Sequence, residues 1–248
     1  MKLLADIGNS QIKIAISKDE KITKVKTFSL KEINLVQQHF RNICKKEECS
    51  LFYSSVIGDD FEEEFTNFVS KIFMKVNKFK SSKSFLSVKN AYSMPSKLGS
   101  DRWLQIIGAH EAYKQNTMIV SLGSAISIDY VSSKGIHKGG VLLSGADRYT
   151  KCFSDIHNLK AIKLSKFSNT KAKILENTTT KQIAMGYELM ISSSINKIYS
   201  DLNSKSKKKV LLILSGSYAK NISGIVATKK IIEPYFVLKS LALIEKYF

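Results

Sequence analysis

The first residues that could do chemistry follow an apolar, strand-like segment near the N-terminus. Asp6 lies close to the end of that segment, and the turn Gly8-Asn9-Ser10 comes directly after it. A carboxylate cannot stay buried and charged without a partner, and a hydrated Mg²⁺ is a natural one. The turn offers backbone N–H groups and short polar side chains to phosphate oxygens. The pattern predicts a magnesium and phosphate site, with a hairpin turn capped by an Asx side chain as the alternative.

A second candidate carboxylate lies in the sequence Gly99-Ser100-Asp101-Arg102. Asp101 is predicted to be the N-cap of a helix that runs to Tyr113. It could also accept a proton from a substrate hydroxyl. Arg102 falls in the first helical turn, where the helix dipole favours acids, and this mismatch favours an anion-binding role for it.

Three later segments rich in small residues could line the remainder of a phosphate and nucleotide site. They are 121–125 (SLGSA), 137–145 (HKGGVLLSG) and 214–217 (LSGS). The hydroxyls of the first could line a phosphate site, and a strand that ends in small residues leaves room for a flat base. The glycine pair in the second indicates a bulge, or close approach by a ligand or another backbone. Each of these segments, taken alone, is more typical of a plain turn or bulge.

Two stretches with the same order of elements must position these residues. Residues 3–17 and 118–131 each read as strand, tight turn, strand, and a third strand follows each of them, over 22–28 and 136–143. Helical spacing of apolar residues predicts helices over 61–72, 101–113, 179–202 and 234–247, and a buried strand is predicted over 210–214. We expect two related α/β domains that meet near residue 117. The longest irregular stretch, 79–99, is of a length that is often functional.

The composition limits the class of protein. The chain has 248 residues, 44% of them hydrophobic, which supports a buried core and excludes a fibrous or disordered class. No apolar run approaches the ~20 residues of a membrane span, and the N-terminus lacks the order of a signal peptide, so we expect a cytoplasmic protein with no membrane partner. Three cysteines and four histidines fit neither a disulfide framework nor a zinc site.

The formal net charge of +18 indicates an anionic partner or a solvated basic surface. Only three of the 39 basic residues are arginine, the type that favours bidentate contacts to guanine and phosphate. The lysines are spread along the chain, and their densest run, 205–209, is short. We therefore favour a solvated basic surface and expect no nucleic-acid partner.

The ordered motifs resemble those of one family, the type III pantothenate kinases of the acetate and sugar kinase/Hsc70/actin superfamily. The motifs are DxGN[ST] at Asp6, a tyrosine followed by LGxDRW, a GTA-like turn, GGxxxxG and a late small-residue turn. The most specific stretch runs from Asn90 to Trp103, and the resemblance spans about residues 3–240. It implies two related ribonuclease H-like domains of the actin-like ATPase superfamily, 1–117 and 118–248, each a mixed β-sheet flanked by helices.

The resemblance implies an activity: ATP-dependent phosphorylation of pantothenate to 4′-phosphopantothenate, the first step of coenzyme A biosynthesis, by a homodimer. It implies that Asp101 is the general base, that Asp6 helps to hold Mg²⁺, and that position 121 faces a monovalent cation, K⁺ or NH₄⁺. Implied ATP contacts are Asp6, Ile7, Gly8, Asn9, Ser10, Gln11, Ile12, Lys13 and Ser124. Implied pantothenate contacts are Tyr92, Gly99, Ser100, Asp101, Arg102 and Thr179. Without the resemblance, Tyr92 reads as a loop anchor and Thr179 as a helix N-cap.

The sequence departs from the family pattern at three positions. Ser121 replaces the cation-ligating Asp, Ser144 replaces a Pro, and Ser217 replaces the second Gly of the late pair. A neutral hydroxyl binds K⁺ less strongly than a carboxylate does, and Ser217 could crowd the nucleotide. Two alternatives therefore stay open: another small-molecule kinase of the same fold, or a catalytically weakened paralogue that acts as a nucleic-acid-associated regulator. Salt-dependent retention of DNA without ATP turnover would favour the regulator.

Overall fold

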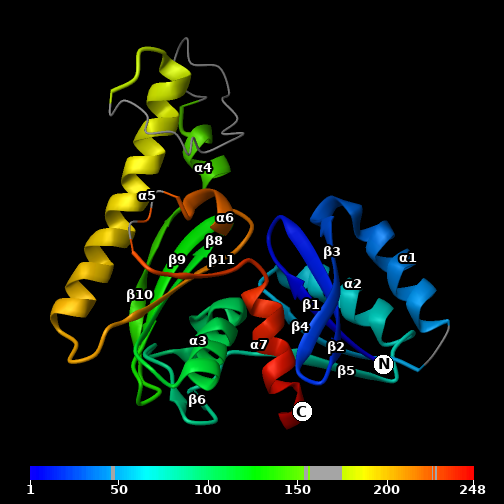
Figure 1. Ribbon diagram of the computed structural model, residues 1–248. Coiled ribbons are helices and arrows are strands. Elements are labelled where there is room, and N and C mark those ends of the chain that lie inside the picture. Colours follow the sequence, from blue (N-terminus) through cyan, green and yellow to red (C-terminus); the bar gives the residue numbers. More distant parts are fainter. Residues whose placement is uncertain (46–47, 154–155, 157–174, 225, 227) are drawn as a thin grey trace. The chain divides into compact units, whose positions relative to one another are not determined.

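The structure is a computed structural model that describes residues 1–45, 48–153, 156, 175–224, 226 and 228–248 (Figure 1). The chain divides into two compact units, one of Met1–Tyr113 together with Tyr235–Phe248 and one of Lys114–Pro234. The sequence-based partition at residue 117 differs from this division in the C-terminal segment, because the last helix packs in the first unit. No helix within the described ranges is long and apolar enough to cross a membrane.

The sheet of the first unit has five strands in the order β3-β2-β1-β4-β5. β1 pairs antiparallel with β2 and parallel with β4. The elements up to the end of this sheet are β1 (Lys2–Ile7), β2 (Gln11–Lys18), β3 (Lys21–Ser29), η1 (Leu30–Glu32), α1 (Ile33–Cys44), β4 (Ser50–Ser55), α2 (Asp59–Val69) and β5 (Lys75–Phe79).

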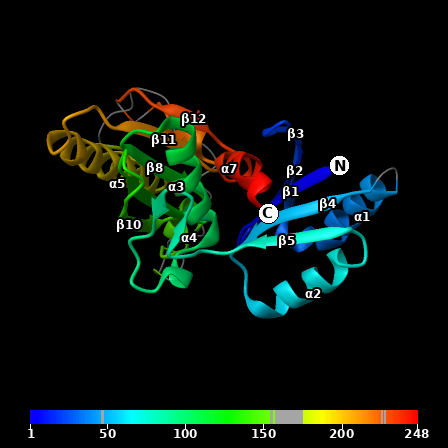
Figure 2. The same ribbon diagram turned by 90° about the horizontal axis from the view of Figure 1, so that it is seen from below.

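Helices cover both faces of this sheet (Figure 2). Apolar residues of α1 and α2, such as Val36 and Phe65, pack in one core cluster with Leu3, Ala5 and Leu51 of the strands. The other face lies against α7 and α3, which also pack on each other. The remaining elements of the unit are β6 (Ser84–Phe85), β7 (Val88–Lys89), η2 (Pro95–Lys97), α3 (Ser100–Tyr113), α7 (Phe236–Ile244) and η3 (Glu245–Tyr247).

The second unit repeats the strand order of the first. Its sheet runs β10-β9-β8-β11-β12, with β8 antiparallel to β9 and parallel to β11. Tyr187, Ile191 and Ile195 of the long α5 pack against this sheet in a buried cluster. The elements are β8 (Thr117–Leu122), β9 (Ala125–Val131), β10 (His137–Ser144), α4 (Ala146–Lys151), α5 (Thr179–Ser204), β11 (Leu211–Ser215), α6 (Ala219–Ile222) and β12 (Ile231–Glu233). The shared order confirms the internal repeat that the two strand–turn–strand stretches predict.

Two predicted N-caps are wrong, because both residues lie inside the helices that they were expected to precede. α3 begins at Ser100, so Asp101 lies inside the first turn and is not the N-cap. The N-cap of α5 is Thr178, so Thr179 is the first helical residue. Both sequences offer several residues that can cap a helix, and the pattern alone does not select among neighbours.

Gly108 provides a test of the packing between α3 and α7. A Cβ added at this glycine would overlap the Ser240 hydroxyl and lie 2.6 Å from the Ser240 Cβ. We predict that Gly108→Ala lowers the free energy of unfolding by about 1–3 kcal/mol, because α7 must shift to admit the methyl group. Gly58→Ala is the control, since nothing lies within 4 Å of its added Cβ. Urea denaturation of both variants measures the difference, and equal stabilities would contradict the close approach of the two helices.

Candidate functional site

The Asp6 carboxylate lies near the end of β1 and faces the neighbouring strand. Its register partner on β2 is Lys13, and the Lys13 Nζ is 3.8 Å from the Asp6 Oδ2. Both side chains are largely buried, with exposed fractions of 13% for Asp6 and 15% for Lys13. The strand–turn–strand geometry therefore brings together an acid and a base that are seven positions apart in the sequence. Gly8 closes the turn between them, where its N–H donates to the Gln11 carbonyl at 3.0 Å.

The pKa of Asp6 is raised to about 6. Burial is the largest cause, because desolvation disfavours the charged carboxylate. Lys13 opposes this shift and lowers the pKa, whereas the carboxylate of Asp101 raises it further. The influence of Asp101 shows that the two predicted carboxylates share one electrostatic environment. In that environment Lys13 only partly compensates the buried charge of Asp6.

Two serines connect the strand of Asp6 to the helix of Asp101. Ser54 on β4 is the register partner of Asp6, and its hydroxyl lies 2.8 Å from the Ser100 hydroxyl. The Ser100 hydroxyl is also 3.1 Å from the Ser55 carbonyl. Ser54 and Ser100 are both buried, so these contacts fix the start of α3 against the end of β4. Sequence analysis missed Ser54, because a serine at the end of a strand carries no distinctive signal.

Gly99 leaves the space that the Asp101 carboxylate occupies. A Cβ at position 99 would lie 2.6 Å from the Asp101 Oδ1. Any side chain at position 99 would therefore displace the carboxylate. Gly99, two residues before the proposed base, therefore has a steric role that the sequence motif does not reveal.

The predicted substrate residues Tyr92 and Arg102 contact each other. The Arg102 Nη1 donates to the Tyr92 hydroxyl at 3.1 Å, and the guanidinium carbon lies 5.8 Å from the centroid of the Tyr92 ring. The Tyr92 backbone N–H donates to the Asn90 side chain at 3.0 Å, which orders the loop before α3. Tyr92 thus holds Arg102 in place within this unit.

The metal ligands that the first unit offers fit a divalent cation that is bound mainly through the phosphates of a nucleotide. The described ranges contain no group of three or more His, Cys, Asp or Glu side chains that could hold a metal ion. Mg²⁺ in kinases commonly uses one or two carboxylates, several waters and the phosphates of its nucleotide. The incompletely compensated carboxylate of Asp6 suits this mode, because a dication would stabilise the buried charge.

The turns of the second unit meet at one end of its sheet. Gly123 and Ser124 form the turn between β8 and β9, and a Cβ at Gly145 would overlap the carbonyl oxygen of Gly123 and lie 2.5 Å from that of Ser124. Gly216 has a φ of +90°, and its added Cβ would overlap the Leu122 carbonyl. The three small-residue segments, 121–125, 137–145 and 214–217, are therefore in close backbone contact. This contact requires the glycines at 145 and 216.

Ser121 occupies in the second sheet the position that Asp6 occupies in the first. Each lies two residues before the glycine of the first turn, and the register partners of Ser121 are Ser127 on β9 and Ser215 on β11. The neighbours of Ser121 along these strands are thus neutral hydroxyls. Thr179, the remaining predicted contact, is an exposed residue in the first turn of α5.

The glycine pair at 139–140 forms a bulge, as one reading of the sequence predicts. Gly139 has a φ of +97°, and the register of β10 with β9 shifts between His137 and Gly140. A Cβ at Gly140 would overlap the Ile128 carbonyl and the Asp129 carboxylate. The Asp129 Oδ1 lies 3.2 Å from the His137 Nε2, and both residues are buried. The two glycines therefore allow the backbone of β10 to approach β9 closely, next to the buried Asp129 and His137.

The strand order and the turns together define a class of protein. Two mixed sheets of order 3-2-1-4-5, each with a polar turn between its first two strands, are the ribonuclease H-like domains of the actin-like ATPase superfamily. The sequence profile of type III pantothenate kinases matches residues 2–201. The chain therefore belongs to the type III pantothenate kinase family, and it is a kinase.

Curated relatives extend over the whole chain. The chain is 26% identical to the type III pantothenate kinase of Sulfurihydrogenibium sp. (strain YO3AOP1), with 100% of both chains covered. It is also 26% identical to the type III pantothenate kinase of Nitrosococcus oceani, over 99% of this chain and 94% of the relative.

Solved structures support the fold alone. A protein of Campylobacter jejuni, named as a Baf family transcriptional activator, has a TM-score of 0.62 at 22% identity and covers 99% of this chain and 98% of its own. A protein of Sinorhizobium meliloti, named as a 2-dehydro-3-deoxygalactonokinase, has a TM-score of 0.63 at 8% identity, over 100% of this chain and 99% of its own.

The raised pKa of Asp6 predicts a pH-dependent stability. Above pH 6 the folded protein holds a buried carboxylate whose burial is unfavourable, and protonation removes that penalty as the pH falls through 6. We predict that the wild-type protein gains about 1–3 kcal/mol from this group between pH 7.5 and pH 4.5, and that Asp6→Asn lacks the gain. Denaturant unfolding at several pH values, without divalent cations, measures it. Asp19→Asn, at an exposed aspartate, is the control. Parallel pH profiles for Asp6→Asn and the wild type would contradict the burial of this charge.

Proposed function

We propose that this kinase transfers the γ-phosphoryl group of ATP to pantothenate and forms 4′-phosphopantothenate, the first step of coenzyme A biosynthesis. The observation that carries the proposal is the shared environment of Asp6, Lys13 and Asp101 in a chain of this family. Such an arrangement offers a metal ligand, a cation for phosphate and a proton acceptor at one site. We also propose that the enzyme works in the cytoplasm as a homodimer.

The proposed reaction needs little covalent chemistry from the protein. Asp101 accepts the proton of the primary alcohol, the alcohol oxygen bonds to the γ-phosphorus, and the bond from that phosphorus to the β-γ bridging oxygen breaks to release ADP. The transition state is loose, so positioning and charge neutralisation matter most. Mg²⁺ held by Asp6 would supply positive charge to the phosphates. The N–H groups of residues 6–13 and the hydroxyl of Ser124 would orient ATP.

Pantothenate would be held through its carboxylate and its polar backbone. Arg102 is the cation suited to the carboxylate, and its contact with Tyr92 restricts the guanidinium before substrate arrives. Gly99, Ser100 and Thr179 complete the proposed substrate set. Ser100 is a positioning residue in this proposal: its hydroxyl already contacts Ser54 and Ser55, and these contacts fix the start of α3.

The test of this function is a coupled assay of the purified protein with ATP, Mg²⁺ and pantothenate, applied also to Asp101→Asn. The amide keeps the size of the carboxylate but cannot accept the proton. We predict that kcat falls about 10²–10⁴-fold, with a much smaller change in the KM for ATP. Thermal unfolding verifies that the variant is folded. A kcat close to the wild-type value would remove Asp101 from the role of base.

The same assay separates the proposal from its rivals. Turnover of ATP with another alcohol but not with pantothenate would indicate a different small-molecule kinase of this fold. The second candidate is a weakened paralogue that binds nucleic acid, which the net charge of +18 and the departures at Ser121 and Ser217 motivate. Salt-sensitive retention of an oligonucleotide, together with no turnover of any tested alcohol, would support that candidate.

The neutral surroundings of Ser121 predict weak or no activation by K⁺ or NH₄⁺. Its strand neighbours Ser127 and Ser215 add hydroxyls but no carboxylate. Activity measured against KCl, with ionic strength held constant by a large organic cation, should therefore stay nearly flat. Ser121→Asp should create or strengthen a dependence on K⁺, and Ser121→Asn is the matched uncharged control. Strong activation of the unmodified enzyme by K⁺ would contradict the prediction.

A further inference from the structure

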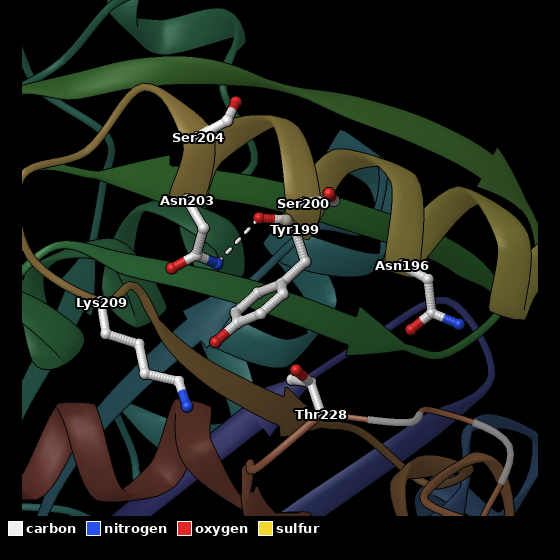
Figure 3. A pocket seen from close by; sticks show the side chains of 7 residues that line it. All are labelled: Asn196, Tyr199, Ser200, Asn203, Ser204, Lys209 and Thr228. Carbon is white, nitrogen blue, oxygen red and sulfur yellow. Dashed lines mark hydrogen bonds between the residues drawn. The ribbon is translucent and has the colours of Figure 1, made fainter.

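A cavity of about 730 Å³, wide open to solvent, lies in the second unit beside the C-terminal half of α5 (Figure 3). Its lining includes Asn196, Tyr199 and Ser200 from α5, together with Lys209 and Thr228. The volume falls in the range of ~300–1,000 Å³ that is typical of small-molecule sites. Most of the lining side chains can form hydrogen bonds, and the single charged one is a cation.

The cavity is separate from the turns assigned above to the nucleotide. Lys209 comes before β11, which starts at Leu211, whereas Gly216 directly follows the end of that strand. Five strand residues at ~3.3 Å each place the two ends roughly 17 Å apart. The kinase reaction proposed above does not use this end of the sheet.

Hydrogen bonds fix one wall of the cavity. The Tyr199 hydroxyl donates to the Val210 carbonyl at 2.9 Å. The Asn203 side chain accepts from the Val210 N–H at 2.9 Å and donates to the Tyr199 carbonyl at 2.9 Å. These bonds join α5 to the start of β11 and hold the Tyr199 ring in the position seen in Figure 3. The wall is therefore formed before any ligand binds.

Other side chains of the lining have hydrogen-bonding capacity to spare. Within the described ranges, the side chains of Asn196, Ser200 and Thr228 make no hydrogen bond to another residue. Together with the Lys209 ammonium they present two hydroxyls, one amide and one cation above the buried side chain of Tyr199. This set matches a ligand that has an anionic group, further polar groups and a carbon skeleton.

The charge around the cavity favours an anion. Lys205, Lys207, Lys208 and Lys209 follow α5 within five residues, and all four are exposed. In the sequence from 196 to 210 the single acid is Asp201, which pairs with Lys197 at 2.7 Å. The C-terminus of a helix carries only about half a negative charge, so four lysines leave a clear positive excess there.

We propose that this cavity binds a phosphate monoester of a nucleoside or a sugar, as a ligand distinct from the substrates of the kinase reaction. Lys209 would pair with the phosphate. The hydroxyls of Ser200 and Thr228 and the amide of Asn196 would bind the ligand's hydroxyl groups, and its carbon skeleton would lie against the apolar part of the lining. The positive charge favours the phosphate, and the polar side chains of the lining favour the ligand's hydroxyl groups.

The test titrates the full-length protein with AMP and with ribose 5-phosphate in buffer without Mg²⁺, and adenosine is the uncharged control. The readout is the side-chain amide signal of Asn196 in a ¹H–¹⁵N spectrum, which is assigned by its loss in Asn196→Asp. This signal reports on the cavity and not on the kinase site, and no turnover is required. Failure of the proposed kinase function would therefore leave the result unaffected.

We expect at least one of the two phosphates to shift the Asn196 signal, and adenosine to leave it unchanged. Lys209→Gln should weaken this binding about tenfold or more, because it removes a charge-assisted contact. Lys134→Gln, which makes the same change in net charge at an exposed site outside the cavity, should leave the affinity within about twofold. A response to AMP alone would identify a nucleoside phosphate, and a response to both compounds a sugar phosphate.

Three results would overturn the proposal. The first is an Asn196 signal that neither phosphate moves. The second is equal weakening by Lys134→Gln, which would indicate diffuse attraction to a basic surface. The third is a shift produced by a DNA or RNA oligonucleotide but by neither small phosphate, which would indicate a polynucleotide surface.

Discussion

The incompletely compensated charge of Asp6 is the constraint on which the first unit depends. The carboxylate is placed by strand register between Lys13 on one side and Ser54 on the other. Ser54 in turn contacts Ser100 and so fixes the helix that carries Asp101. Burial and the second carboxylate raise the pKa of Asp6 more than Lys13 lowers it. The fold thus holds negative charge where a dication and phosphates would stabilise it, which accords with the proposed transfer reaction.

The second unit repeats the architecture without repeating the charge. Ser121 replaces Asp6 at the equivalent strand position, and its partners are Ser127 and Ser215 where the first unit has Lys13 and Ser54. Glycines at 145 and 216 allow the turns of this unit to approach within backbone contact. At this strand position the first sheet therefore offers charged groups, whereas the second offers neutral hydroxyls.

The sequence predicts the local elements well, because each depends on neighbouring residues. Alternating apolar residues around a glycine turn define 3–17 and 118–131, and the repeated sheet order confirms them. Long-range contacts leave weaker signals. The helical pattern of 234–247 does not reveal that this segment packs in the first unit. The link between Ser54 and Ser100 is invisible in the sequence, because it depends on how two distant segments meet. The proximity of Asp6 and Asp101 could be expected only from the family resemblance, and their catalytic roles stay predictions.

The most direct test of this account is the pKa of the Asp6 carboxyl, followed by ¹³C NMR with and without Mg²⁺ and ADP. The account predicts a value of about 6 in the absence of the ligands. When the metal and nucleotide bind, the value should fall by more than about one unit, because the charged form gains a cationic partner. An ordinary pKa without ligands, or no change on their addition, would contradict the claim that this carboxylate is buried to hold the metal.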